Sequence, residues 1–324
     1  MAAANTGTYL TTATNSNAAT GLREDLQDKI TRIDPEDTPF YSNAGKGTAE
    51  AVYHEWLVQR LAAAAANAQV EGFETTFVQP TPAVRLGNYC QIAAKNWSIS
   101  GTLNVVNKAG RGKETVYQQM LKGIEVRRDV EAALTGAFGN TIKKGTDARN
   151  FGTFATYVTS YLFGATGAAP AGDGSTGGTA GTPRPITLAL ISTGMQQAFQ
   201  LGGKPTTLLV GPQQKRNISA LINTAGTATS EYMIQQVKQS AIIGAVSVYV
   251  TDFGDLAIVP SRFMATNAAY GIQWDYVTVA TLPQRNFIVQ ELAKTGDAEK
   301  GQIIWEGTLR VDAPQAHFIV ADLS

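Results

Sequence analysis

Hydrophobic residues recur at regular spacings in some parts of the chain and show no period in others. Residues 1–20 are rich in Ala, Asn, Ser and Thr without a hydrophobic period, which is typical of an extended or mobile arm. In the next segment, LREDLQDKITRI at 22–33, large apolar residues recur every three or four positions: Leu22, Leu26, Ile30 and Ile33. This spacing predicts a short amphipathic helix.

The clearest helical period lies in KETVYQQMLKGIEVRRDVEAALTGAF at 113–138. Its apolar residues keep helical spacing in two successive groups: Val116, Met120 and Ile124, then Val126, Val130, Leu134 and Phe138. Arg127 and Glu131 lie one turn apart and can form an ion pair. At 1.5 Å per residue the segment forms a rod of about 39 Å, so we expect it to be the spine of the fold.

Two segments rich in β-branched and aromatic residues, 51–61 and 88–100, predict the strands of an antiparallel hairpin. The stretch between them holds an alanine run at 62–66, a glycine and two prolines, and few large apolar residues. A hairpin of this kind cannot form a core of its own. We therefore expect it to be an arm that lies on another surface.

Residues 164–184 consist mainly of Gly, Ala, Thr and Pro and predict a loop between two regions. Beyond it, segments of helical and strand character alternate as in α/β proteins. The predicted helices are 186–200 and 213–222, and the predicted strands are 206–210, two within 246–264 around a turn near Gly254, 270–282, 302–311 and 316–322.

The segment RIDPEDTPFYSN at 32–43 joins the predicted N-terminal helix to the rest of the chain. It contains carboxylates, prolines and aromatic residues: Asp34, Glu36, Asp37, Pro35, Pro39, Phe40 and Tyr41. The prolines prevent the helix from continuing. The carboxylates could suggest an acidic catalytic or metal site, but no histidine or partner carboxylate pattern accompanies them. We interpret them as turn chemistry, with Asp37 or Thr38 capping the local backbone and the aromatic residues anchoring the turn.

Composition and charge narrow the classes of function. With 324 residues the chain is long enough for one large domain or two of ordinary size. Lys plus Arg and Asp plus Glu both number 26, so no bulk attraction to nucleic acid or anionic membrane is expected. The single cysteine, Cys90, excludes an intrachain disulfide, and no stretch approaches the roughly 18 apolar residues of a membrane span.

Candidates for chemistry are few. The chain has only two histidines, His54 and His317, which we interpret as structural. A phosphate-loop lookalike ending in RGKE has Asn107 in place of the first glycine and Glu114 in place of the magnesium-ligating Ser or Thr. The kinase-like triplet at 252–254 lacks the other kinase motifs and is read as a tight turn. We expect no catalytic residue, no cofactor site and no metal site.

Basic residues gather at two places. The cluster of Lys143, Lys144 and Arg149 and the pair Arg127 and Arg128 could touch phosphate. Each is more simply a solvated face or a donor in a salt bridge between subunits.

Six motifs occur in a recognisable order: IDPEDTPF (33–40), EW followed by L, N and EG (55–72), NYCQIAAK and SGT (88–102), RRDVEAAL (127–134), TDFGDLAIVPSRFM (251–264) and LAKTGDAEKGQIIWEGTLRV (292–311). With these motifs the chain resembles the major capsid proteins of tailed bacteriophages, whose shell fold is named after phage Hong Kong ninety-seven. The resemblance covers nearly the whole chain.

This resemblance implies an α+β phage major capsid fold. The implied parts are an N-terminal arm and short helix at 1–30, a Pro-rich joint at 31–50, an extended loop (β-hairpin) at 51–100, a peripheral domain at 101–185 and 299–324 with the spine helix at 113–138, and an axial α/β domain at 186–298. Subunits of this family form hexamers and pentamers that close into an icosahedral head around double-stranded DNA. The protein is then expected in the virion, after assembly in the cytoplasm of the bacterial host.

The resemblance also implies partners. They are further copies of the chain, a portal, a decoration protein and non-specifically packaged DNA on the inner surface, with no membrane. Only about 20 residues precede the first predicted helix, so we expect a separate scaffolding protein. The expected assembly contacts lie in the extended loop, the joint and the spine helix: Trp56, Arg60, Leu61, Asn67, Glu71, Phe73, Phe77, Asp34, Glu36, Asp37, Arg127 and Arg128.

Two alternatives remain open. An encapsulin-like compartment would use the same shell fold to house an enzyme, and association with a cargo enzyme instead of nucleic acid, scaffold and portal would identify it. An α/β small-molecule-binding protein built on 186–298 would need a pocket with convergent polar groups, lined for example by Asp252, Asp255 and Arg262.

Overall fold

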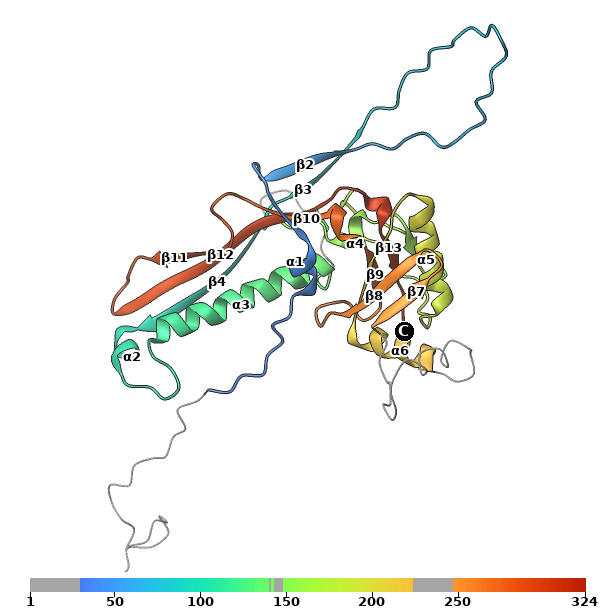
Figure 1. Cartoon of the computed structure of the whole chain (residues 1–324). Helices are drawn as coiled ribbons and strands as arrows, with labels where there is room; N and C mark the ends of the chain where they lie inside the picture. Colours follow the sequence, from blue (N-terminus) through green and yellow to red (C-terminus); the bar gives the residue numbers. More distant parts are fainter. Residues whose placement is uncertain (1–29, 140, 143–147, 224–246) are drawn as a thin grey trace, which may run out of the picture.

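The computed structural model describes residues 30–139, 141–142, 148–223 and 247–324. Figure 1 shows an elongated lobe built along a long helix, a rounder lobe beside it, and a loop that projects far from both. No helix in these ranges is long and apolar enough to cross a membrane.

Most of the N-terminal predictions lie outside the described residues. The arm at 1–20 and the greater part of the predicted helix at 22–33 cannot be compared with the structure. Residues 30–38 are described, and they form no helix or strand. Ile33 is almost fully exposed there.

The predicted spine is confirmed as helix α3, Glu114–Thr135. The helix ends at Gly136, whose φ of 83° is the left-handed conformation that glycine adopts without strain. The next residue, Ala137, donates its N–H to the carbonyl of Ala132 at 3.0 Å, which closes the last turn. Phe138, predicted as the last residue of the apolar face, therefore lies beyond the helix and is 61% exposed.

Only half of the apolar face of α3 meets the core of its own chain. Val126, Val130 and Leu134 are buried, whereas Val116 and Met120 are 62% and 52% exposed. The C-terminal half thus holds the helix against the body, and the N-terminal half leaves apolar surface uncovered.

The elongated lobe combines α3 with a five-stranded sheet (Figure 1). Its strands are β1 (Gly45–Thr48), β4 (Gln91–Ser100), β10 (Val277–Thr281), β11 (Ile288–Leu292) and β12 (Ala298–Val311). β12 is central, since it pairs with β10 and β11 along one edge and with β4 along the other. α3 packs on β4 and β12, and a short helix, α2 (Gly101–Val105), follows β4.

The rounder lobe holds a six-stranded sheet in the order β5-β13-β9-β6-β8-β7. The strands are β5 (Tyr161–Leu162), β6 (Thr207–Val210), β7 (Val248–Thr251), β8 (Gly254–Pro260), β9 (Ala269–Ile272) and β13 (Phe318–Val320). Helices α5 (Leu188–Gln200) and α6 (Pro212–Asn223) belong to this lobe. The helices predicted at 186–200 and 213–222, the strand predicted at 206–210 and the turn predicted near Gly254 are confirmed.

Phe318 fills the centre of this lobe because glycine leaves room for its ring. A Cβ added at Gly271 would lie 2.0 Å from a ring carbon of Phe318, and one at Gly194 would lie 2.3 Å from another. The two glycines are thus required by close packing of a strand and a helix on the same ring.

The predicted hairpin exists, but its second strand is not the one expected. β2 (Tyr53–Val58) pairs with β3 (Val84–Tyr89), not with 88–100. Most of 88–100 forms β4, which pairs over ten residues with β12, from Ala298↔Ser100 to Gly307↔Gln91. The segment 88–100 was expected to pair with β2 because the two are close in sequence. Most of it pairs instead with β12, a long strand from the C-terminal region.

A second difference concerns 270–282, predicted as one strand. It forms β9 and β10, which are separated by a 3-10 turn at Trp274–Tyr276 and lie in different sheets. β10 and β11 therefore belong to the elongated lobe although they fall within 186–298, and β13 belongs to the rounder lobe although it falls within 299–324. The loop at 164–184 is confirmed as irregular, apart from isolated bridges.

His317 is a buried, structural histidine whose neutral form the fold requires. Its Nδ1 accepts the backbone N–H of Gln273 at 3.2 Å, and burial lowers its pKa to about 3. Because the unfolded pKa is about 6.5, the stability that the neutral form contributes is complete above that pH and is lost as pH falls from 6.5 toward 3.

We expect the free energy of unfolding to fall by about 2 kcal/mol from about pH 7 to about pH 5 because of His317. His317→Gln keeps a hydrogen-bond acceptor but does not titrate, so its stability should change much less over this range. Urea unfolding at both pH values measures the difference. An equal loss in the variant would show that other groups cause the pH dependence.

Candidate assembly surfaces

The extended loop, residues 59–83, is an exposed apolar segment without contacts that bury it. It has no helix or strand, and Figure 1 shows it reaching away from both lobes. Its large apolar side chains are exposed to solvent: Leu61, Val70, Phe73, Phe77 and Val78. Apolar residues grouped in this way on a single chain indicate a surface that another molecule covers.

Trp56 anchors the base of this loop to its own chain. Its Nε1 donates to the carbonyl of Val311 at 2.9 Å, and its ring centroid lies 5.7 Å from that of Tyr157. Tyr157 in turn donates its hydroxyl to the carbonyl of Gly87 in β3 at 3.0 Å. Trp56 is 8% exposed, so most of its ring packs within its own chain, and its contact with a neighbouring subunit stays a prediction.

The other loop residues in the expected set are exposed. Arg60 lies 3.5 Å from Gln315 Oε1, and Asn67 accepts from the side chain of Gln69 at 3.2 Å. Glu71 has no hydrogen bond or ion pair through its side chain within the described chain, and the apolar side chains of Leu61, Phe73 and Phe77 are exposed. They remain candidates for contact with another subunit.

The joint is fastened to α3 through a buried carboxylate. Helix α1 (Pro39–Asn43) begins where a turn was expected, and Glu131 of α3 accepts the backbone N–H groups of Phe40 at 2.8 Å and of Tyr41 at 2.7 Å. Burial raises the pKa of Glu131, and the two backbone hydrogen bonds oppose that shift. Phe40 is fully buried with its ring 5.6 Å from that of Phe154, which confirms it as an anchor.

Arg127 does not pair with Glu131 as predicted. Its Nε donates to Thr38 Oγ1 at 2.8 Å and its Nη2 to Ser42 Oγ at 3.0 Å. The guanidinium is therefore bound to the joint and α1 instead of to the carboxylate of Glu131. The hydroxyl of Thr38 thus accepts a hydrogen bond from Arg127, and the predicted capping of the backbone by Thr38 is not formed. The Arg127 guanidinium also lies over the ring of Tyr41, with 5.5 Å to the centroid. This expected assembly contact is used within the subunit.

Lys46 completes the charged surroundings of the joint. Its ammonium lies 3.6 Å from the centroid of the Tyr41 ring and donates to the carbonyl of the same residue. Burial, and to a lesser degree the charge of Arg127, lower the pKa of Lys46 to about 8. The joint and the spine helix are therefore held together by hydrogen bonds and charge around α1.

The three joint carboxylates face solvent. Arg32 forms an ion pair with Glu36 and lies 3.9 Å from Asp34. Asp37 has no ion-pair partner among the described residues. Turn chemistry by Asp37 is not seen, and all three remain candidates for contact with a neighbour.

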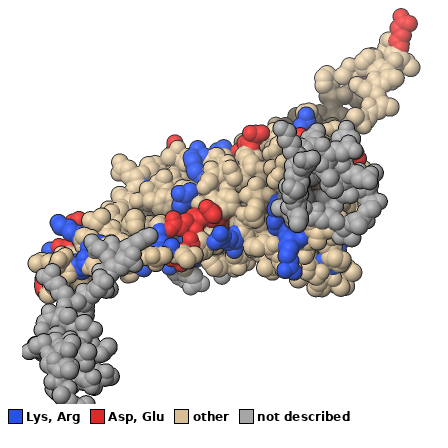
Figure 2. All heavy atoms as spheres, turned by 60° about the horizontal axis from the view of Figure 1, so that its bottom comes forward, with Lys and Arg blue, Asp and Glu red and all other residues tan. Residues whose placement is uncertain are grey.

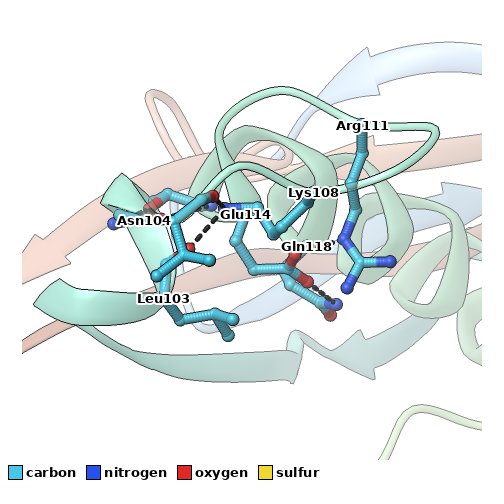
Figure 3. Close-up of polar contacts among 8 residues, drawn as sticks. Leu103, Asn104, Lys108, Arg111, Glu114 and Gln118 are labelled. Carbon is cyan, nitrogen blue, oxygen red and sulfur yellow. Dashed lines mark hydrogen bonds and ion pairs between the residues drawn. The ribbon is translucent and has the colours of Figure 1, made fainter. Parts of the chain in front are cut away.

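The phosphate-loop lookalike is a structural corner at the far end of α3 (Figure 3). Glu114, the first residue of the helix, accepts from Arg111 and from Gln118, the latter at 2.8 Å, and the hydrogen bond from Gln118 is the main reason its pKa is lowered. Lys108 donates to the carbonyl of Leu103, in the middle of α2. Lys108 and Arg111 of this motif are thus bound to their own chain.

Asn104 ties the same corner to the sheet. Its Nδ2 donates to Glu299 Oε2 of β12 at 2.7 Å and to Thr115 Oγ1 at 2.8 Å. Hydrogen bonds therefore connect the C-terminal end of α2 with the N-terminal ends of α3 and β12.

The basic cluster gives no free phosphate site among the described residues. Arg149 forms an ion pair with Glu306 at 2.9 Å, and Arg285 binds the other oxygen of the same buried carboxylate at 2.8 Å. Lys143 and Lys144 lie outside the described residues.

A groove of about 540 Å³ opens beside the C-terminal half of α3. We call it the α3 groove; its charged and aromatic lining residues are Lys95, Glu125, Arg128, Asp129, Phe138, Arg262 and Phe263. The guanidinium of Arg128 lies over the Phe263 ring, 5.8 Å from its centroid. Figure 2 shows carboxylates and cations side by side on this side of the elongated body.

The three residues named for a small-molecule pocket do not line the same groove among the grooves described. Arg262 lines the α3 groove, but Asp252 and Asp255 do not. Within the described ranges no group of three or more His, Cys, Asp or Glu side chains could hold a metal ion. The features that stand out are surfaces for contact: the extended loop, the joint and the α3 groove.

Comparison with known proteins points in one direction. The family described as "SU10 major capsid protein" matches residues 4–324. A segment of 113 residues is 35% identical to the "Major capsid protein" of Escherichia phage Phieco32, and it covers 35% of this chain and 32% of that protein. The chain therefore matches about a third of the length of this relative.

Solved structures share the fold at low identity. The chain is similar to the capsid protein of cyanophage A-1(L), with a TM-score of 0.63, 11% identity, and coverage of 93% of this chain and 97% of the other. It is also similar to the SrpI encapsulin of Synechococcus elongatus, with a TM-score of 0.54, 9% identity, and coverage of 91% and 92%. The predicted phage capsid fold is thereby confirmed.

Proposed function

Because the chain belongs to the SU10 major capsid protein family, we propose that it is a head subunit that assembles into hexamers and pentamers and closes an icosahedral shell around phage DNA. The extended loop carries this proposal. Its exposed apolar side chains have no cover within one chain, and a neighbouring copy in a closed shell would bury them.

The two lobes suggest a division of roles. In this proposal the elongated lobe with α3 and β12 is the peripheral domain, and the rounder lobe with α5 and α6 is the axial domain at the capsomer centre. The pairing of β10, β11 and β13 moves the proposed boundaries away from 186–298 and 299–324, because strands are assigned to the sheet in which they pair.

The other partners follow from the same proposal. They are a portal, a separate scaffolding protein, a decoration protein and DNA on the inner surface, in a virion assembled in the host cytoplasm. Because the formal net charge is zero, the chain has no bulk attraction to DNA, and in this proposal its contact with the packaged DNA is local and weak. An encapsulin-like compartment is a second candidate because an encapsulin shares the fold, but membership of a major capsid protein family favours the phage head.

Assembly of the purified chain tests this function. We expect electron micrographs of the protein expressed in Escherichia coli to show closed shells or separate capsomers, and sedimentation to show species far larger than the 34.3 kDa monomer. Particles that hold a cargo enzyme from their native source would favour the compartment. A chain that stays monomeric with and without a scaffolding protein would contradict both.

A further inference from the structure

His54 lies at the base of the extended loop, on the face of the β2–β3 hairpin that meets the body. It is paired with Asn88 across the hairpin, and Trp56, two residues further along β2, shares its face. Both neighbours are bound to β12: Asn88 donates to the carbonyl of Leu309 at 2.8 Å, and Trp56 donates to the carbonyl of Val311 at 2.9 Å. The ring of His54 lies 6.1 Å from that of Trp56. His54 is therefore part of the contact that docks the hairpin on β12.

This position suits a neutral imidazole and not a charged one. The Nε2 atom of His54 is buried and has no hydrogen-bond partner among the described residues. A neutral ring can keep its single proton on Nδ1, whereas the imidazolium carries an N–H on both nitrogens. Protonation would therefore place a buried donor where no acceptor is available, which costs free energy in the docked state.

The charges around His54 act in both directions. Arg310 and Asp312 of β12 face the ring, and Glu50 lies in the segment that precedes β2. Burial lowers the pKa of His54, and the charge of Arg310 lowers it as well, while Asp312 and Glu50 oppose the shift. Asp312 already forms an ion pair with Arg310 at 3.0 Å. The neutral ring is thus favoured while the hairpin is docked.

The hairpin brings no further charge to this face. Side chains alternate along a strand, so Glu55 and Arg85 point to the opposite, exposed side, where they lie 3.8 Å apart. The residue opposite His54, Asn88, is an amide and does not titrate. The charge of the ring itself is therefore the quantity that pH changes here near neutrality.

We propose that His54 is a proton-controlled latch at the base of the extended loop. A neutral ring keeps the inner face of the hairpin on β12, and a protonated ring weakens that docking, so that the direction of residues 59–83 can change. The docked state favours the neutral ring, so its contribution is complete above the unperturbed pKa of about 6.5. It is lost as pH falls through the lower pKa of the docked ring. This inference goes beyond the proposed function, because the latch acts within a single chain.

Hydrogen exchange followed by mass spectrometry tests the latch on the full chain, as subunits or as shells. Exchange at the imidazole C2 position reports the pKa of each of the two histidines, and that of His54 should lie below about 6.5. Amide exchange in β2 and β3, corrected for the intrinsic effect of pH, should show opening at least about threefold more frequent at about pH 5 than at about pH 7.5.

Three variants separate the latch from other effects of pH. His54→Gln does not titrate, so β2 and β3 should open equally often at both pH values. His317→Gln is the matched control, because it removes the other titrating ring and should keep the full response of β2 and β3. Asp312→Asn removes a charge that favours the imidazolium and should enlarge the response.

The outcomes distinguish the latch from the capsid function. A wild-type chain without the pH response, a response that persists in His54→Gln, or a His54 pKa at or above about 6.5 would overturn the latch and leave the capsid function intact. A chain that never assembles but shows the response would contradict the capsid function and support the latch.

Discussion

Deletion of residues 62–82 is expected to leave a folded subunit that no longer forms shells. The deletion joins residue 61 to residue 83 and leaves a four-residue connection between β2 and β3, a length that hairpins accept. The body loses little, because the deleted side chains are exposed and the anchor at Trp56 remains. Shortening the loop should raise the free energy of unfolding by about 1–2 kcal/mol, since a shorter loop loses less entropy on closure.

Electron microscopy measures whether the deletion variant forms shells, and urea unfolding measures its free energy of unfolding. A Gly-Ser segment of equal length in place of 70–78 keeps the reach of the loop and removes its apolar and acidic side chains, and it should also block assembly. Changing the alanines at 62–66 to serine alters the loop away from its tip and should be tolerated. Normal particles from the deletion would sink the idea that this loop serves contact between subunits.

Glu131→Ala is expected to cost about 2–5 kcal/mol of unfolding free energy. The carboxylate accepts two backbone N–H groups at the start of α1, and its loss leaves both without a partner in a buried site. α1 would then separate from α3, and Phe40 would lose its place against Phe154. The midpoint of urea unfolding measures the cost.

Asp129→Ala is the matched control on the same helix. Asp129 forms a solvent-exposed ion pair with Lys95 at 3.0 Å, which contributes about 1 kcal/mol or less. A similar small cost for Glu131→Ala would contradict the role of Glu131 in fastening the joint.

The spine helix was predictable because its signals are local. Apolar spacing, a good run of helix formers and a glycine after the last turn agree for α3, and the structure places its end within three residues of the expected position. The turn at Gly254 and helices α5 and α6 follow for the same reason. The exposed loop was predictable as a segment without a core, because composition alone shows that it has little to bury.

The strand partners were not predictable in this way. β4 and β12 are separated by almost two hundred residues in sequence and carry no local mark of their pairing. A strand pattern identifies a segment that can pair, whereas the partner depends on which apolar faces close the core together. The same limit explains why 270–282 looked like one strand and is divided between two sheets.

The expected assembly contacts show the same difference between what local sequence predicts and what tertiary packing decides. Sequence alone determined the family resemblance, the long helix, the coreless loop and the absence of a familiar catalytic motif, because each depends on residue type and spacing. Tertiary structure decided that Trp56 and Arg127 form hydrogen bonds within their own subunit, and that Arg128 and Arg262 come together beside α3. An exposed and a buried side chain of one type are identical in sequence; only the folded chain shows which groups have found partners and which remain free to meet another copy.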